Sequence, residues 1–161
     1  MSNQIIRKRA IVTDDFVHIA DDADIPDGAQ PIVTLARYQK QGGELAERFS
    51  RLGVRVPSDK LPQDIPQLTR LALIAIEFPK FTDGRGYSVA RMLRERHAFT
   101  GELRAVGWVL RDNLLYMERC GFDAFELKPG KPLESALEAF GEFSATYQAG
   151  VDDKRPIYRR R

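Results

Sequence analysis

The clearest indication of the fold is LALIAIEFPKFTDGRGYS, residues 71–88. Its first six residues are apolar without interruption, which is typical of a strand covered on both faces within a parallel sheet. The rest is charged and glycine-rich, and Ser88 is a good N-cap for a helix that follows. Binding sites in parallel α/β proteins collect where strands end and helices begin. The stretch therefore predicts a strand–loop–helix unit with a site in its loop.

Apolar runs elsewhere in the chain predict the other elements. Strands are expected at residues 31–35, 54–56, 103–110 and 124–127, with helices between them, and Gly53 suits the end of the first helix. Two short antiparallel strands within residues 5–20 are expected to flank a turn at residues 13–15. Alternating strands and helices imply right-handed crossovers and a parallel sheet.

The predicted fold is a single α/β domain. It has a mainly parallel sheet of about five strands with βα repeats and an N-terminal antiparallel β-hairpin, and an incomplete βα barrel is the alternative. We expect residues 1–30 to hold the hairpin and an acidic loop. Residues 31–147 would form the α/β domain, and residues 148–161 a basic C-terminal tail.

Composition narrows the functional classes. The 161 residues are 43% hydrophobic and 30% charged, which is enough for one domain with a core. The net charge of +2 and the lack of a basic stripe argue against nucleic-acid binding. There is no secretory signal and no apolar run near the ~20 residues that span a bilayer. One cysteine fits a reducing cytoplasm, so we expect a cytoplasmic protein that binds no membrane.

The loop at residues 80–88 has two interpretations. In the first it is an anion cradle, in which two glycines with positive φ let the backbone approach a ligand while basic side chains and the helix N-terminus attract negative charge. In the second it is a tight turn in which Asp83 caps the backbone and pairs with Arg85. The sequence leaves both open, because it matches no established phosphate-binding motif.

A second charged loop follows the strand at residues 103–110. Asp112 is either a helix N-cap or a catalytic or ligand group, and this strand end should face the same side as the first loop. The catalytic candidates are therefore Asp83 and Asp112. The ligand-binding candidates are Lys80, Asp83, Gly84, Arg85, Gly86, Ser88, Arg91, Asp112 and Asn113.

The cysteine, the histidines and the remaining strand-end carboxylates are expected to have structural and not catalytic roles. Cys120 is expected to be a buried apolar filler at a helix end. His18 and His97 are far apart in sequence, so no metal site is predicted. Asp123 and Glu126 are expected to be solvated carboxylates at a strand end. No cofactor is identified, since nucleotide fingerprints, haem ligand patterns and cluster cysteines are all lacking.

Three motifs, FPKFTDGRGYSVARMLR, GELRAVGWVLRDN and RCGFDAFEL, resemble a bacterial family known as domain of unknown function 934. The resemblance runs from about residue 32 to residue 147. Asn113 departs from it, because family members commonly carry glutamine there. The matching residues are Phe78, Pro79, Asp83, Gly84, Arg85, Gly86, Ser88, Ala90, Leu93, Arg94, Gly107, Asp112, Arg119, Gly121, Phe122, Asp123, Phe125 and Glu126.

The resemblance implies a role in sulfur assimilation. Family members are described as oxidoreductases of sulfite reduction and are typically encoded beside assimilatory sulfite reductase. We therefore expect an accessory protein that acts with sulfite reductase. The alternative is a small enzyme, with an oxidoreductase as one form of it, that binds an anionic or phosphorylated ligand at the C-terminal edge of the sheet. Self-association is left open.

Overall fold

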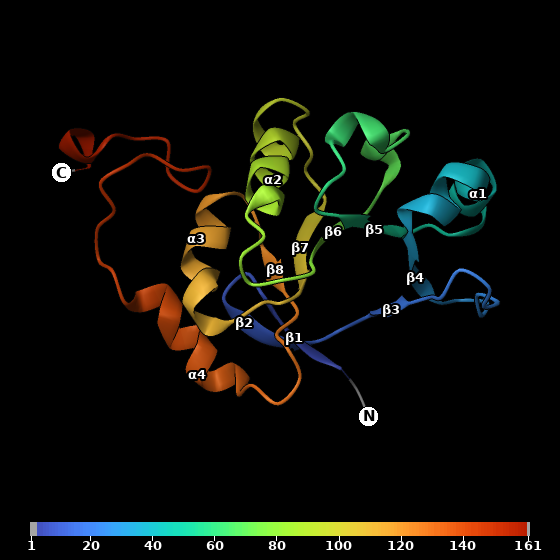
Figure 1. The fold of residues 1–161 in the computed structure, drawn as a ribbon, viewed down its shortest axis with the longest axis horizontal. Helices are drawn as coiled ribbons and strands as arrows, with labels where there is room; N and C mark the ends of the chain where they lie inside the picture. Colours follow the sequence, from blue (N-terminus) through green and yellow to red (C-terminus); the bar gives the residue numbers. More distant parts are fainter. Residues whose placement is uncertain (1–2, 161) are drawn as a thin grey trace.

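The computed structural model describes residues 3–160 and contains one eight-stranded sheet in the order β2-β1-β8-β7-β6-β5-β4-β3 (Figure 1). From β3 to β8 every neighbouring pair is parallel, whereas β1 is antiparallel to both of its neighbours. The strands are β1 (Gln4–Arg7), β2 (Ala10–Thr13), β3 (Phe16–His18), β4 (Gln30–Thr34), β5 (Gly53–Pro57), β6 (Leu73–Phe78), β7 (Glu102–Gly107) and β8 (Ala124–Phe125).

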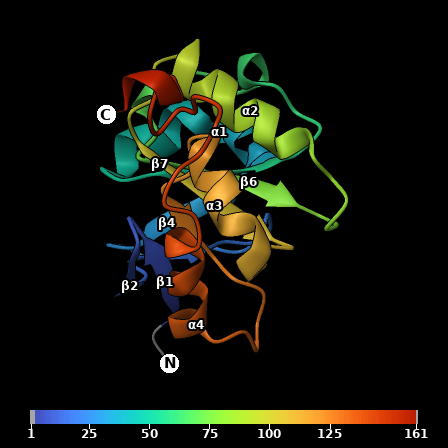
Figure 2. The same cartoon turned by 90° about the vertical axis from the view of Figure 1, so that its left-hand side faces the viewer.

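The helices lie in an arc around the outside of this sheet (Figure 1). Parallel strands that follow one another in chain order, joined by right-handed crossovers, keep all their helices on one face. After α4 the chain runs back along α3 (Figure 2). The α-helices are α1 (Leu35–Arg48), α2 (Arg85–Glu95), α3 (Leu114–Arg119) and α4 (Leu133–Leu137), with 3-10 turns at Pro62–Asp64, Leu68–Arg70, Arg111–Asn113, Glu138–Gly141 and Ile157–Arg159.

Alternate residues of the strands face two different environments. Ile74 and Ile76 of β6 belong to the large core under the helices. Leu73 and Ala75 of the same strand join Phe16, Ile32 and Val106 in a small cluster on the inner, concave face. The period-2 alternation of a strand explains this division.

The sheet curls because its two edge strands are consecutive in the sequence. β2 ends at Thr13 and β3 begins at Phe16, so only Asp14 and Asp15 join the two edges. The result is a curled, mixed half-barrel in a single α/β domain. The predicted fold class is right, and the incomplete barrel describes the sheet better than an open one. The predicted number of about five strands is too low.

Several predicted boundaries are wrong. The hairpin turns at Lys8 and Arg9, which have positive φ of 49° and 62°, and not at residues 13–15. Helix α2 begins at Arg85 with Gly84 as its N-cap, so Ser88 lies inside the helix. Gly53 does not end α1 but opens β5, where a side chain would meet Ile32 and Leu73. Within residues 3–160, every helix is too short or too polar to cross a bilayer.

Candidate functional site

The loop after β6 is organised around Asp83. Its carboxylate accepts hydrogen bonds from the Arg85 backbone N–H (3.1 Å), from Arg85 Nη2 (2.7 Å) and from the Ser58 hydroxyl (2.7 Å). The side-chain hydrogen bond from Arg85, followed by that from Ser58, holds the pKa of Asp83 well below its usual range. The geometry is that of the tight turn, with the Arg85 guanidinium engaged by Asp83. That this loop binds an anion stays a prediction.

The two glycines of the loop do not have the positive φ that the cradle requires. Gly84 has φ −90°, and neither Gly84 nor Gly86 is among the positive-φ residues. Gly86 is buried, and a Cβ built on it would lie 2.7 Å from the Phe78 ring. Its role is therefore close packing of α2 against β6.

The other predicted site residues lie in the loop after β6, in α2 and in the segment after β7, at one edge of the sheet. β6 and β7 pair in parallel up to Phe78 and Gly107, and Asn113 Nδ2 donates to the Tyr87 hydroxyl at 3.1 Å, which links the loops. Arg91 is paired with Glu95 on its own helix. Lys80, Ser88 and Asp112 are exposed. Asp112 is not the predicted N-cap, because Asn113 holds that position in α3 without a side-chain capping bond.

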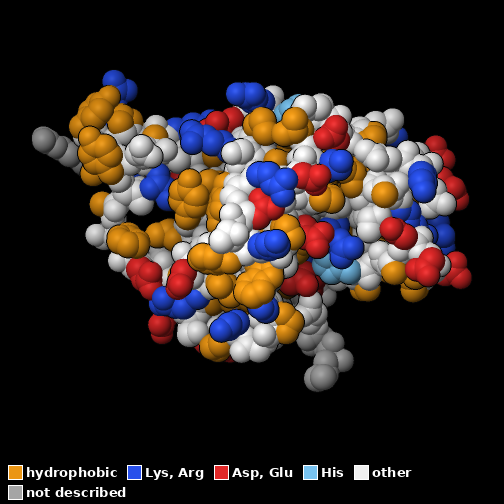
Figure 3. Space-filling model, viewed as in Figure 1, with side chains coloured by type: hydrophobic (Ala, Val, Ile, Leu, Met, Phe, Trp, Pro, Cys, Tyr) orange, Lys and Arg blue, Asp and Glu red, His pale blue; other side chains and the backbone are white. Residues whose placement is uncertain are grey.

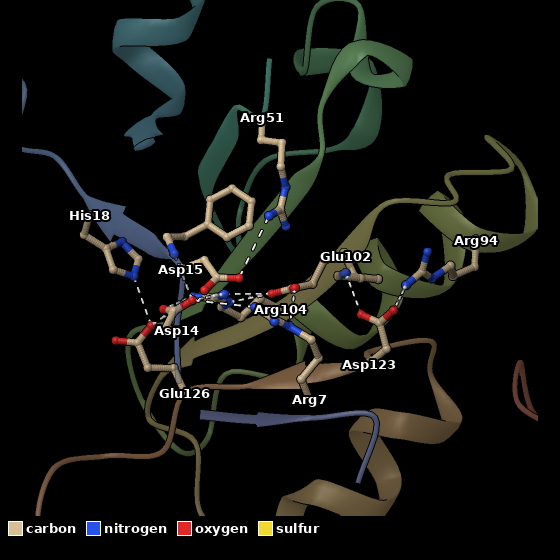
Figure 4. Close-up of polar contacts among 12 residues, drawn as sticks. Arg7, Asp14, Asp15, His18, Arg51, Arg94, Glu102, Arg104, Asp123 and Glu126 are labelled. Carbon is tan, nitrogen blue, oxygen red and sulfur yellow. Dashed lines mark hydrogen bonds and ion pairs between the residues drawn. The ribbon is translucent and has the colours of Figure 1, made fainter. Parts of the chain in front are cut away.

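Sequence reasoning missed a cluster of charged side chains on the concave face (Figure 4). Arg104 of β7 is fully buried and donates from both Nη atoms to Asp14, at 2.7 and 2.8 Å. Its Nε donates to Glu102 at 2.8 Å. Arg7 Nε lies 2.7 Å from Glu102 without a hydrogen-bonding alignment, so that contact is ionic. The cluster therefore holds the two-residue link between β2 and β3 against β7, in the middle of the sheet.

His18 and Glu126 meet beside this cluster. His18 Nε2 lies 3.0 Å from Glu126 Oε2, and Arg104 Nη1 lies 3.8 Å from the same oxygen (Figure 4). The hydrogen bond with His18, which outweighs the opposing effect of burial, lowers the pKa of Glu126. Glu126 is therefore not the solvated carboxylate that the sequence suggested. Its partner is 108 residues away, and only the curl of the sheet brings the two together.

A cavity of about 200 Å³ opens at the carboxyl ends of β4, β5 and β6, and we call it the strand-end pocket. Arg55 and Glu77, on neighbouring strands, lie 3.8 Å apart at its wall. Ligand sites of βα barrels lie at this end of the strands. The pocket is lined by Asp21, Thr34, Leu35, Ala36, Gln39, Arg55, Pro57, Lys60 and Glu77.

Exposed aromatic side chains gather over α3 and the segment after α4, where Figure 3 shows hydrophobic side chains at the surface. We call Tyr116, Phe143, Tyr147 and Tyr158, which are 60%, 66%, 82% and 71% exposed, the aromatic surface. The first three border a hollow of about 340 Å³. Arg160 donates to the Thr146 carbonyl at 2.8 Å, which holds the last turn of the chain beside that hollow.

The family model described as "Bacterial protein of unknown function (DUF934)" matches residues 53–158. The chain belongs to this family. The range matched in this DUF934 protein includes β5 to β8 and the whole aromatic surface, while His18 and Asp14 lie before it. Neither a curated protein nor a solved structure matches the chain.

Two further observations bear on chemistry in the DUF934 protein. Among residues 3–160, no three His, Cys, Asp or Glu side chains are grouped to hold a metal ion. Cys120 is buried, and burial raises the pKa of its thiol, as the prediction of an apolar filler implies. Ionisable groups do face one another on the concave side, for example in the cluster around Arg104 and in the His18–Glu126 pair.

We expect replacement of His18 by alanine to raise the pKa of Glu126 toward its ordinary value, because the hydrogen bond from His18 is the largest cause of its lowering. A carboxyl group with a depressed folded-state pKa stabilises the fold above its unfolded pKa, and this contribution is lost as pH falls through the folded pKa. The variant should therefore lose less stability than the wild type between about pH 6 and about pH 3. Carbon-detected NMR titration of Glu126 checks this directly, and an unchanged pKa would contradict it.

Proposed function

We propose that this protein is an accessory protein of bacterial sulfite reduction and that it acts by docking on sulfite reductase through the aromatic surface. The sequence resemblance suggests the pathway and the partner. The observation that carries the docking mode is the aromatic surface itself. Four large aromatic side chains are each more than half exposed, and three of them border one hollow.

Such a surface is unusual for a chain that works alone. Aromatic residues are enriched in the buried centres of protein interfaces, and large exposed apolar patches mark interaction sites. The hollow between Tyr116, Phe143 and Tyr147 is also lined by Leu115 and Ala145, so an apolar side chain of a partner would fit into it. This is the arrangement in which a few residues supply most of the binding free energy.

Basic side chains near the surface in the chain favour an acidic partner. The Arg159 guanidinium lies 5.8 Å from the centroid of the Tyr158 ring. Arg159 and Lys154 are exposed and form no ion pair within the described part of the chain. The nearby Arg155 and Arg119, in contrast, are engaged by Asp153 and Asp152. We therefore expect the matching face of sulfite reductase to present an apolar side chain flanked by carboxylates, which would steer association at low ionic strength.

Growth of a gene-deletion strain tests the functional proposal. Without the protein, growth on sulfate or sulfite should slow, while growth on cysteine should be unaffected because cysteine bypasses sulfite reduction. Complementation by the wild-type gene should restore growth, and complementation by a Tyr147→Ser, Phe143→Ser variant should not. Normal growth of the deletion strain on sulfite would show that the protein has no role in this pathway.

A further inference from the structure

The strand-end pocket contains ionised groups of both signs that have few bonds to the protein. Arg55 and Glu77 face each other at 3.8 Å, too far for a hydrogen bond, and Lys60 lies 4.0 Å from Asp59. Within residues 3–160, none of the side chains of Arg55, Lys60 and Glu77 donates or accepts a hydrogen bond. By comparison, Arg104 and Arg94 each donate several to neighbouring groups.

The position of these groups in the fold is also that of a ligand site. Thr34, Arg55 and Glu77 come from the carboxyl ends of three adjacent parallel strands, β4, β5 and β6. Thr34 and Glu77 are each two residues beyond a member of the concave-face cluster. Arg55 is two residues beyond Gly53, where a Cβ would meet members of that cluster, so all three project from the concave side. The cavity of about 200 Å³ is smaller than those that hold drug-sized molecules, which limits the ligand to a few heavy atoms.

The charges of the pocket determine the ligand class. The cations Arg55 and Lys60 are balanced by the carboxylates of Asp21 and Glu77, so a doubly charged oxyanion would gain attraction from two groups and suffer repulsion from two others. A small molecule with one carboxylate and one ammonium group can satisfy both signs. We propose that the strand-end pocket binds a free α-amino acid as its zwitterion.

In this site Arg55 and Lys60 hold the carboxylate of the amino acid, and Glu77 with Asp21 receives its ammonium group. Arg55 is suited to its part because a guanidinium presents paired donors that match a carboxylate. The Thr34 hydroxyl donates a hydrogen bond to Asp21, which keeps that carboxylate beside the pocket. The aromatic surface contributes none of the lining residues, so the amino-acid site stands or falls independently of docking on sulfite reductase.

Titration of the purified, full-length protein with four probes tests the proposal. The probes are L-alanine, propionate (which lacks the ammonium group), ethylammonium (which lacks the carboxylate) and sulfate. Saturable shifts of the Arg55 and Glu77 NMR signals are expected with L-alanine. Each of the other three probes should bind at least about tenfold more weakly than L-alanine. Sulfate or propionate binding as tightly as L-alanine, or no saturation by L-alanine up to roughly 10 mM, would overturn it.

Variants locate the site. Arg55→Gln and Glu77→Gln should each weaken L-alanine binding by about tenfold, which corresponds to the loss of one charged hydrogen bond. Arg96→Gln is the matched control, because Arg96 is an exposed arginine at the end of α2 and does not line the pocket. Unchanged L-alanine affinity in both pocket variants would overturn the assignment of these residues.

Discussion

Replacement of Asp14 by alanine is expected to lower the free energy of unfolding by about 3–5 kcal/mol. Arg104 is 0% exposed, and Asp14 accepts from both of its Nη atoms. Removing the aspartate leaves a buried guanidinium with only Glu102 as a close partner, and the distant Glu126 oxygen at 3.8 Å compensates poorly. Urea denaturation followed by circular dichroism measures the loss.

Two further variants show whether the loss of stability in Asp14→Ala comes from the unpaired buried charge. Asp27→Ala removes an exposed ion pair with Arg48 and should change stability by less than about 1 kcal/mol. An Asp14→Leu, Arg104→Met double variant should recover much of the loss, because an apolar pair avoids an unpaired buried charge. If Asp14→Ala behaves like Asp27→Ala, the buried pair does not hold the curled sheet together.

Substitution of the aromatic surface is expected to have the largest effect on binding. Phe143→Ser and Tyr147→Ser should each weaken docking on sulfite reductase by about 30-fold, the effect of losing about 2 kcal/mol at an interface hot spot. Both side chains are mostly exposed, at 66% and 82%, so neither change should destabilise the isolated protein much. Thermal unfolding of each variant checks that the fold is intact.

Phe81 provides the matched control for these variants. It is a phenylalanine exposed to a similar extent, 55%, but it lies in the loop after β6 and lines neither the hollow nor its rim. Phe81→Ser should bind like the wild type. If all three variants bind sulfite reductase equally weakly, the loss reflects surface hydrophobicity in general. That result would contradict a specific docking surface.

The sequence was sufficient to predict the elements that have strong local patterns. The apolar run of β6 and the alternation of strands and helices predicted a parallel α/β sheet. The hairpin turn was misplaced because Lys8 and Arg9 adopt the positive φ usually supplied by Asn-Gly, so no turn signal marks them. The strand expected after residue 15 is β3, but it pairs in parallel with β4, and the strand expected before residue 13 is divided into β1 and β2.

The polar sites depend on contacts that no local pattern contains. Asp14 and Arg104 are 90 residues apart, and they meet because the two sheet edges share one short link. The glycines at residues 84 and 86 suggested an anion cradle, yet Gly86 allows α2 to pack closely against Phe78. Arg55 and Glu77 become neighbours only once β5 and β6 are paired, although each follows the alternation of its strand.

Isothermal titration calorimetry of purified sulfite reductase from the same bacterium into this protein is the most direct test of docking through the aromatic surface. We expect saturable binding by the wild type and by Phe81→Ser, and binding at least about 30-fold weaker by Phe143→Ser and by Tyr147→Ser. The affinity of the wild type should fall as salt is added, because the exposed guanidinium of Arg159 lies against Tyr158 of the surface. The absence of binding by the wild type, or equal binding by the two aromatic-surface variants, would contradict docking through this surface.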